Sequence, residues 1–407
     1  MAHQSQNNGG RQTTMRRKRV WLITVVVAVP AVVVWFLWIS GFWRDSRGAD
    51  ERLAEIEAAR AIPDSENAAI IYNELLRDPN AISLLDYLPE SLDRRVFSRT
   101  HREPWLSRDL PELAAWAANY RFVIDRLLDA SRFEKCRFLI TIDAAKIGQM
   151  LGRAAPMRRW GYLLSSAANN DIAEGRIDSA MTKWQCLLQM DNHLWQQPVP
   201  TDHLTGIDVG ESALGSMARF LVRGAPTAIH LQYIEAMPLP TTDDWAKHLK
   251  ETREIEHLTM RRLTENCGPL DRVRQRLFLW RINYAMYGTL KRPDAAGVAG
   301  DLYRGHIATA RGIRILVALR RYKNATGRWP ASLDEIRASL PAEVLIDPLN
   351  GGAFVYQPAP DAFRLYSRGK NNIDENGDWQ PEGADDWPIW PPRGRNAEPE
   401  QENADGV

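Results

Sequence analysis

The chain has 407 residues, of which 44% are hydrophobic, so it is long enough for more than one folded unit with an apolar core. Its 52 Lys and Arg residues nearly cancel its 51 Asp and Glu residues, and the net charge of +1 provides no global field that would attract nucleic acid. Nucleic acid is therefore not an expected partner.

The N-terminal region is predicted to be a membrane anchor. Residues 20–43 read VWLITVVVAVPAVVVWFLWISGFW, an uncharged run of about 24 residues that, at about 1.5 Å per helical residue, crosses a hydrocarbon core of about 30 Å. The run is longer than the apolar part of a cleaved signal peptide and ends in aromatic residues rather than a small-residue cleavage site. Basic residues 16–19 precede it and mixed charges follow it, so the positive-inside rule keeps the polar, disordered tail 1–19 in the cytoplasm. Everything from Arg44 onward is predicted to lie outside the cytoplasmic membrane.

Residues 49–290 are predicted to form a helical domain, because their apolar residues recur at helical spacing and alternating β-branched residues are scarce. The segments ADERLAEIEAARAI and DSENAAIIYNELLRD read as the first two amphipathic helices. The segment PELAAWAANYRFVIDRLLDASR reads as one helix, with an apolar stripe that faces the core: Trp116, Tyr120, Val123, Ile124 and Leu127. Further helices are predicted over residues 209–223, 226–236, 243–264 and 270–290, followed by a linker after Lys291.

One stretch of this domain, GYLLSSAANNDIAEGRIDSAMTKWQCLLQMD (residues 161–191), is predicted to be two antiparallel helices joined at its central Glu-Gly-Arg sequence. It resembles one tetratricopeptide unit of about 34 residues, with Ala168 and Ala180 at the small positions and Trp184 at the aromatic position of that pattern. The resemblance covers one unit, and Asp171 stands where the pattern has tyrosine. A TPR-like hairpin within a solenoid-like bundle is therefore expected rather than a repeat array.

The helical domain contains none of the common catalytic motifs. Its histidines form no H-E-x-x-H pair, and there is no nucleophile elbow, phosphate-binding loop or dinucleotide-binding loop. The protein is therefore expected not to be an enzyme. The alternative is a dispersed active site, which would require four residues to gather around one pocket: His193, Asp202, His203 and Glu211.

The three cysteines, Cys136, Cys186 and Cys267, lie far apart and form no C-x-x-C pair, which excludes a zinc ribbon and a redox motif by spacing. They favour three buried apolar residues. One disulfide with a leftover thiol is the alternative, and the sequence does not decide whether Cys136 and Cys186 pair.

Residues 301–390 are predicted to form a small α+β domain. A helix over residues 302–325 ends at the Asn-Ala-Thr-Gly sequence, and Ser332 caps a short helix that comes next. The segments DPLNGGAFVYQ and DAFRLYSRG then read as a turn and two strands.

The order of these elements resembles the globular part of the major pseudopilin of type II secretion systems, over about residues 307–390. The residues that match the family pattern are Tyr322, Gly327, Arg328, Trp329, Pro330, Asp347, Pro348, Gly351, Tyr356, Leu365, Tyr366, Ser367 and Gly369. The N-terminal anchor, the Cys-Arg-Phe stretch at residues 136–138 and this tail together also resemble membrane-anchored proteins of planctomycete-type bacteria, a resemblance that implies no activity.

The chain departs from a pseudopilin at its N-terminus. The apolar run begins Val20-Trp21 without the Gly-Phe-type cleavage site and without the glutamate that follows it in that family. The anchor is also separated from the pilin-like helix by a long helical domain, whereas a pilin's membrane helix continues directly into its globular domain. Assembly into a pseudopilus is therefore the alternative and not the leading expectation.

The segment NNIDENGDW, residues 371–379, is the one candidate metal site. Asp374, Asn376 and Asp378 begin like an EF-hand, but Trp379 stands at the sixth position and Asp385 at the twelfth, where that loop has glycine and glutamate. In the pseudopilin resemblance a calcium-bound loop follows the last Ser-x-Gly and ends in an acidic stretch. This implies a structural calcium ion with five ligand residues: Asp374, Asn376, Asp378, Asp385 and Asp386. The alternative is a solvated, Asx-rich turn without metal.

The sequence thus predicts a mainly α protein with an N-terminal transmembrane helix, a helical bundle, a small C-terminal α+β domain and a disordered tail at residues 391–407. The expected function is a non-enzymatic, protein-interaction or structural role in the cell envelope, related to secretion. The expected partners are the membrane, crossed once, and envelope proteins.

Overall fold

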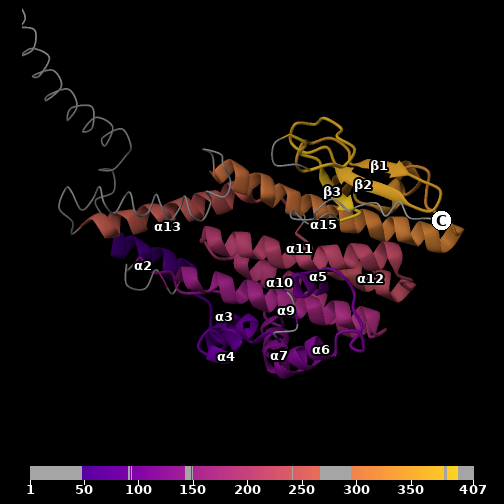
Figure 1. Ribbon diagram of the computed structural model, residues 1–407. Coiled ribbons are helices and arrows are strands. Elements are labelled where there is room, and N and C mark those ends of the chain that lie inside the picture. Colours follow the sequence, from indigo (N-terminus) through magenta and orange to yellow (C-terminus); the bar gives the residue numbers. More distant parts are fainter. Residues whose placement is uncertain are drawn as a thin grey trace, which may run out of the picture. The chain divides into compact units, whose positions relative to one another are not determined.

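The described part of the chain is mainly helical and carries one small antiparallel sheet near its C-terminal end (Figure 1). The computed structural model describes residues 48–89, 92, 94–142, 148, 150–240, 242–265, 295–379 and 383–392. The predicted anchor 20–43, the tail 1–19, the helix 270–290, Cys267 and residues 393–407 lie outside the described residues. Within the described ranges, no helix has the length and apolarity that a membrane crossing needs.

The chain divides into two compact units, Met1–Arg52 and Leu53–Val407. Nearly all of the described residues belong to the second unit. The α-helices of the described residues are α2 (Ala49–Ala59), α3 (Ala69–Leu75), α4 (Pro79–Ile82), α5 (Arg94–Thr100), α6 (Pro111–Asn119), α7 (Arg121–Ala130), α9 (Ala154–Ala173), α10 (Ile177–Trp195), α11 (Pro200–Arg223), α12 (Ala228–Ala236), α13 (Trp245–Glu265) and α15 (Ala295–Thr326). The short 3₁₀ helices are Asp64–Glu66, Leu84–Tyr87, Leu333–Glu335, Arg337–Ser339 and Ala342–Leu345, and the strands are β1 (Val355–Pro358), β2 (Phe363–Ser367) and β3 (Trp387–Trp390).

The predicted helical hairpin is present as α9 and α10, which are joined by residues 174–176. Ala168, Ala180 and Trp184 are fully buried. The indole of Trp184 donates to Ser216 Oγ of α11 at 3.1 Å, so its ring faces α11. α11 packs against both helices of the hairpin. It begins at Pro200, nine residues before the predicted start of a helix at Val209, because Pro200 occupies the first helical turn, where a proline fits.

The segment predicted as one helix over residues 111–132 is two helices instead. Tyr120, with φ −97° and ψ 15°, separates α6 from α7. Its ring is buried and lies 5.2 Å from the ring of Trp116, so the break turns both helices toward one core. The predicted apolar stripe is confirmed as core, since Trp116, Tyr120, Val123, Ile124 and Leu127 are all buried.

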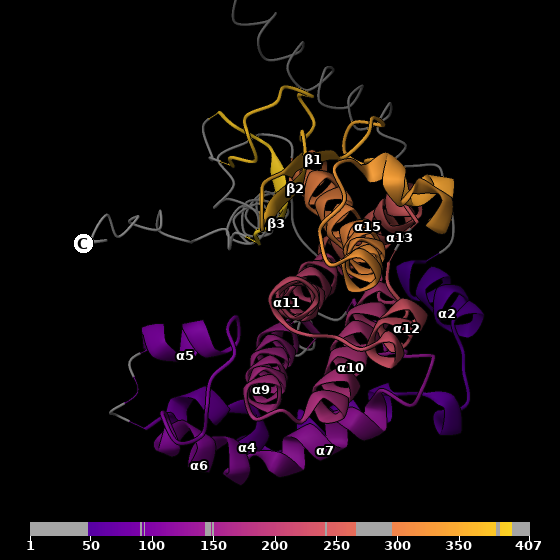
Figure 2. The same cartoon turned by 90° about the vertical axis from the view of Figure 1, so that its right-hand side faces the viewer.

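α15 is the central element of the C-terminal part of the chain. Figures 1 and 2 show it between α11 on one side and the sheet on the other, and it also packs against α12. Apolar side chains along its length are buried, among them Ile307, Ile313 and Leu319. The helical bundle and the C-terminal α+β region therefore share α15 in their cores.

The sheet has the order β1-β2-β3 and is antiparallel throughout. β1 and β2 are the two predicted strands, paired with Val355 opposite Tyr366. β3 was not predicted, because it is short, contains Pro388 and follows an acidic stretch, features that do not indicate a strand. It packs against α15 where a side chain at Gly305 would come within 2.6 Å of the Trp387 ring.

Candidate functional site

The most unusual group of side chains in the described residues is a histidine between two carboxylates, here called the His306 centre (Asp191, Glu211 and His306). His306 of α15 is 0% exposed. Its Nε2 lies 2.9 Å from Oδ2 of Asp191 on α10, and its Nδ1 lies 2.8 Å from Oε1 of Glu211 on α11. Because ionised carboxylates only accept hydrogen bonds, both ring nitrogens donate, and the ring is an imidazolium.

The electrostatics of this centre agree with its geometry. Burial alone would lower the pKa of His306, but the carboxylates of Asp191 and Glu211 outweigh burial and raise the pKa to about 10. Burial raises the pKa of Asp191 above its usual value, although the neighbouring His306 opposes that change. His306 therefore carries a positive charge at neutral pH, in the contact between three helices.

α11 approaches this centre closely because Gly210 has no side chain. A Cβ atom at Gly210 would lie 2.6 Å from Cε1 of His306 and 2.7 Å from Oδ2 of Asp191, closer than van der Waals contact permits. Gly206, one turn earlier, would bring a Cβ to 2.9 Å from Oδ1 of Asp191. The two glycines thus leave room for a carboxylate and an imidazolium where two helices cross.

The polar contacts extend from the His306 centre toward the sheet. Thr309 Oγ1 lies 3.4 Å from Oε2 of Glu211, and the indole Nε1 of Trp387 in β3 donates to Thr309 Oγ1 at 2.9 Å. Hydrogen bonds therefore connect α11, α15 and β3.

On its other side the centre reaches the wall of a cavity of about 700 Å³. Asp191, Trp195, His248 and Tyr303 contribute to that wall. The indole of Trp195 lies near Asp191 and acts to lower the pKa of this carboxyl, against the effect of burial. The indole N–H makes no hydrogen bond of normal geometry with Asp191. Among the described residues, Asp191 Oδ1 and Trp195 Nε1 are buried without a hydrogen-bond partner, so polar capacity is left at this wall.

The His306 centre is arranged for structure rather than for catalysis. Both ring nitrogens are engaged and the ring has no exposed surface, so it is not positioned to exchange a proton with a substrate. Truncating one member of such a group leaves a buried charge unpaired, which is strongly destabilising. The centre is therefore suited to fixing α10, α11 and α15 in one arrangement.

The four residues considered for a dispersed active site are not brought together. His193 bonds to the hydroxyl of Tyr72 and to a backbone carbonyl, and Asp202 forms an ion pair with Arg153. Burial lowers the pKa of His193 to about 4 and that of His203 to about 3, so both rings are neutral at pH 7. His203 stacks on Trp195, whereas Glu211 belongs to the His306 centre.

Cys136 and Cys186 are free and buried, so the two do not form a disulfide. Burial raises the pKa of both thiols, to about 12 for Cys186. A thiol of this kind is not a nucleophile at neutral pH.

The two acidic residues at the end of the predicted calcium loop organise its backbone. Asp385 Oδ2 accepts from the N–H groups of residues 370 and 371, at 3.0 and 3.1 Å. Asp386 Oδ2 accepts from the N–H groups of Glu375 and Gly377, at 3.0 and 2.7 Å. Within the described part of the chain, Asp385 Oδ1 and Asp386 Oδ1 are buried without hydrogen-bond partners. Burial raises the pKa of Asp386 to about 6.

The other predicted ligands lie in the same loop but face different groups. Asp374 Oδ1 accepts from the hydroxyl of Tyr366 at 2.7 Å and from the N–H of Asn376. Asn376 has φ 60°, and its carbonyl oxygen accepts from Arg364. The N–H of Asp378 donates to a backbone carbonyl. No three His, Cys, Asp or Glu side chains of the described residues converge as a metal site, so calcium stays a prediction.

Sequence reasoning missed the His306 centre because its members are about 20 and 95 residues apart in the chain. One signal pointed to it: Gly206-Ile207-Asp208-Val209-Gly210 is a small-xxx-small spacing, which marks a close approach of helices.

Comparison of the chain with protein-family models, with curated proteins and with solved structures finds no match.

Proposed function

We propose that the protein is a single-span, membrane-anchored envelope protein that binds other proteins outside the cytoplasm and catalyses no reaction. The supporting observation is that the side chains of the protein that are capable of catalysis are engaged in structural contacts. His193, His203, Asp202 and the His306 centre are each consumed in buried contacts that hold helices together. A protein built in this way offers surfaces and cavities to partners rather than reactive groups.

The resemblance to pseudopilins supports a secretion-related role, and the arrangement of α15 argues for an adaptor rather than a filament subunit. The helix is followed by short 3₁₀ helices and a sheet, in the order that the resemblance implies. Filament subunits pack through exposed helix faces, whereas α15 is covered by α11, α12 and the sheet. Prepilin processing is the feature that separates the two roles, and an intact N-terminus in purified protein would exclude the filament role.

Site-specific photocrosslinking in the native membrane tests the binding function. A photoreactive amino acid is placed at three exposed apolar positions, Leu139, Ile229 and Ile346, which are 71%, 75% and 47% exposed. We expect one position to give a discrete protein adduct while the buried position Leu187 gives none. Protease added outside spheroplasts should digest the bulk of the chain. Accessibility to protease without an adduct at any exposed position would refute the proposal.

We also propose a structural calcium ion in the loop between residues 374 and 386. The two buried, unpartnered oxygens Asp385 Oδ1 and Asp386 Oδ1 support it, because calcium is bound through carboxylate and carbonyl oxygens. When bound, the ion would neutralise these carboxylates and hold the loop against β2. It would supply no chemistry to a substrate.

A further inference from the structure

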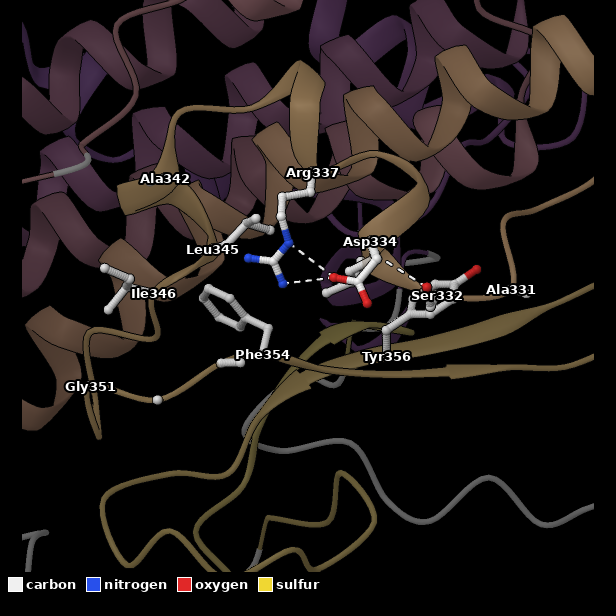
Figure 3. Close-up of a pocket in the computed structure, with 13 residues that line it drawn as sticks. Ala331, Ser332, Asp334, Arg337, Ala342, Leu345, Ile346, Gly351, Phe354 and Tyr356 are labelled. Atoms are coloured by element: carbon white, nitrogen blue, oxygen red, sulfur yellow. Dashed lines mark hydrogen bonds and ion pairs between the residues drawn. The ribbon is translucent and has the colours of Figure 1, made fainter.

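Three cavities of the described residues differ in their charge balance. The cavity beside β1, of about 470 Å³, contains one cation, Arg337, and Figure 3 shows it directed at Asp334. Arg337 Nε and Nη2 lie 3.0 and 2.8 Å from Asp334 Oδ1, so this cavity is neutral. The 700 Å³ cavity has more carboxylates than cations in its wall. The third cavity, of about 570 Å³, has an excess of cations.

This third cavity, here called the cationic cavity, lies where the end of α11, the end of α15, the β1–β2 turn and the end of β3 meet. Arg223, Lys323 and Arg364 line it, against one carboxylate, Asp361. None of these three cations has a carboxylate partner in an ion pair among the described residues. The cavity therefore carries net positive charge.

The negative ends of two helix dipoles offset only part of the positive charge of the cationic cavity. Arg223 is the last residue of α11 and Lys323 lies in the last turn of α15, where helix dipoles favour cations by roughly half an elementary charge each. A different residue already serves the α11 end, because the buried Arg320 donates to the carbonyl oxygens of Leu221 and Val222. Three full charges against one carboxylate and these partial charges leave the cavity positive.

Aromatic rings hold two of the cations in place. Lys323 Nζ lies 4.4 Å from the centre of the Trp329 ring, and the Arg223 guanidinium lies 5.5 Å from that of Trp390. Trp329 is itself fixed by an edge-to-face contact with Phe363, at 4.8 Å. Cations that are ordered before a ligand arrives lose little conformational entropy on binding.

We propose that the cationic cavity binds an acidic peptide segment of a protein partner. The proposal rests on the proposed function, in which the protein acts by binding other proteins, and it names the chemistry of the partner. Acidic side chains complement the unpaired cations, and an aromatic or apolar residue between them complements the Trp329, Phe363 and Trp390 rings. The volume of about 570 Å³ suits a few side chains rather than a folded domain.

Fluorescence anisotropy with the full-length protein in neutral detergent tests this inference. The probe is a fluorescein-labelled peptide, Glu-Glu-Phe-Glu-Glu, and its neutral counterpart has glutamine in place of every glutamate. We expect saturable binding of the acidic peptide that weakens with added salt, and a loss of about tenfold in affinity in the double variant Arg223→Gln, Lys323→Gln. Arg337→Gln, which removes the cation of the neutral cavity, should leave the affinity unchanged. The exchange Arg223→Lys with Lys323→Arg should restore binding, which separates lost charge from lost folding.

Several outcomes would overturn the inference. Equal binding of the neutral peptide, or an equal loss with Arg337→Gln, would remove the cavity from recognition. If inorganic phosphate binds in an Arg223-dependent way and the peptide does not bind, the cavity is a small-anion site. If vesicles containing one quarter anionic lipid bind in that way and the peptide does not, the cavity is a membrane-binding surface. Residues 396–407, which come soon after Pro391, carry four acidic side chains, Glu398, Glu400, Glu402 and Asp405. If the peptide binds to a chain that ends at Pro392 but not to the full-length chain, this acidic tail is the occupant of the cavity.

The same variants distinguish this inference from the proposed function. If the wild type and the Arg223→Gln, Lys323→Gln variant capture a photocrosslinked partner equally, the proposed function stands and the cationic cavity is not the contact. The partner then binds elsewhere on the surface.

Discussion

The His306 centre and the acidic loop that follows β2 both contain buried carboxylate oxygens, and the two regions compensate these charges differently. Asp191 and Glu211 face an imidazolium, so the charges are answered by a side chain from a neighbouring helix. Asp385 and Asp386 face backbone N–H groups through one oxygen each, and their other oxygens are buried without a partner. In the first region an imidazolium faces both carboxylates, although Asp191 Oδ1 also lacks a hydrogen-bond partner. In the second region the carboxylates of Asp385 and Asp386 form no ion pair among the described residues, so this region keeps capacity for a cation.

This difference shows which kind of polar group can serve as a ligand site. A buried charge whose partner comes from the protein contributes to the arrangement of helices, and removing the partner is costly. Burial raises the pKa of Asp386 to about 6, and a cation added beside it would lower that pKa. Substitutions in the two regions should therefore have effects of different size and different dependence on calcium.

The largest effect is expected from removing the imidazolium. The substitution His306→Ala leaves the buried Asp191 and the partly exposed Glu211 together without a cation, and it should lower the free energy of unfolding by about 3–5 kcal/mol. Chemical denaturation of the full-length protein in neutral detergent measures this. His257→Ala, at an exposed histidine of α13, is the control and should change stability little. Similar losses in the two variants would show that the His306 centre does not hold the helices.

The pH dependence of that difference sharpens the comparison. The pKa of His306 is raised from about 6.5 in the unfolded chain to about 10, so its contribution to stability is fully present below pH 6.5 and is lost as pH rises through 10. The stability difference between the wild type and His306→Ala should therefore narrow between pH 7 and pH 10, by about 3 kcal/mol. Denaturation curves at several pH values measure it. A difference that stays constant between pH 7 and pH 10 would mean that His306 is neutral in the folded protein.

The sequence predicted the parts of the fold that local patterns specify. The hairpin of α9 and α10, the apolar stripe of α6 and α7, the part of α15 from residue 302 on and the strands β1 and β2 each follow from periodicity and turn residues. The linker predicted after Lys291 is wrong from Ala295 on, where α15 already begins. The break at Tyr120 was not predicted, although its contact with Trp116 is local. The strand β3 depends on long-range packing against α15, and no local pattern marks it. The His306 centre was beyond reach for the same reason, since three helices must already be in place before its side chains meet. The acidic residues 374–378 lie after β2 and are followed by the unpredicted strand β3, and the spacing of the acidic residues did not show which oxygens lack partners.

Calcium should have an intermediate effect, confined to the acidic loop. Calcium at a concentration ten times its dissociation constant stabilises the folded state by about 1.4 kcal/mol. Calcium should therefore raise the melting temperature of the wild type. The double variant Asp385→Asn, Asp386→Asn keeps a side-chain oxygen for each backbone hydrogen bond but removes both charges, and it should abolish the gain. Asp361→Asn, at an exposed position outside the loop, should preserve it. No calcium-dependent shift in the wild type at about 10 mM, above the weakest affinities of extracellular modules, would exclude the site.

The smallest effect, and the most specific for the close approach of the helices, is expected within α11 itself. Alanine at Gly210 gains about 1 kcal/mol of helix propensity but places a Cβ 2.6 Å from Cε1 of His306, and overpacking of this kind costs about 1–3 kcal/mol. The net loss should be about 1 kcal/mol. Gly215→Ala, in the same helix, meets its nearest atom only at 3.5 Å and should instead be stabilising. Because both substitutions change propensity alike, the difference between them isolates the steric term. Two variants of equal stability would mean that α10, α11 and α15 can separate without loss, and that the His306 centre does not require their close contact.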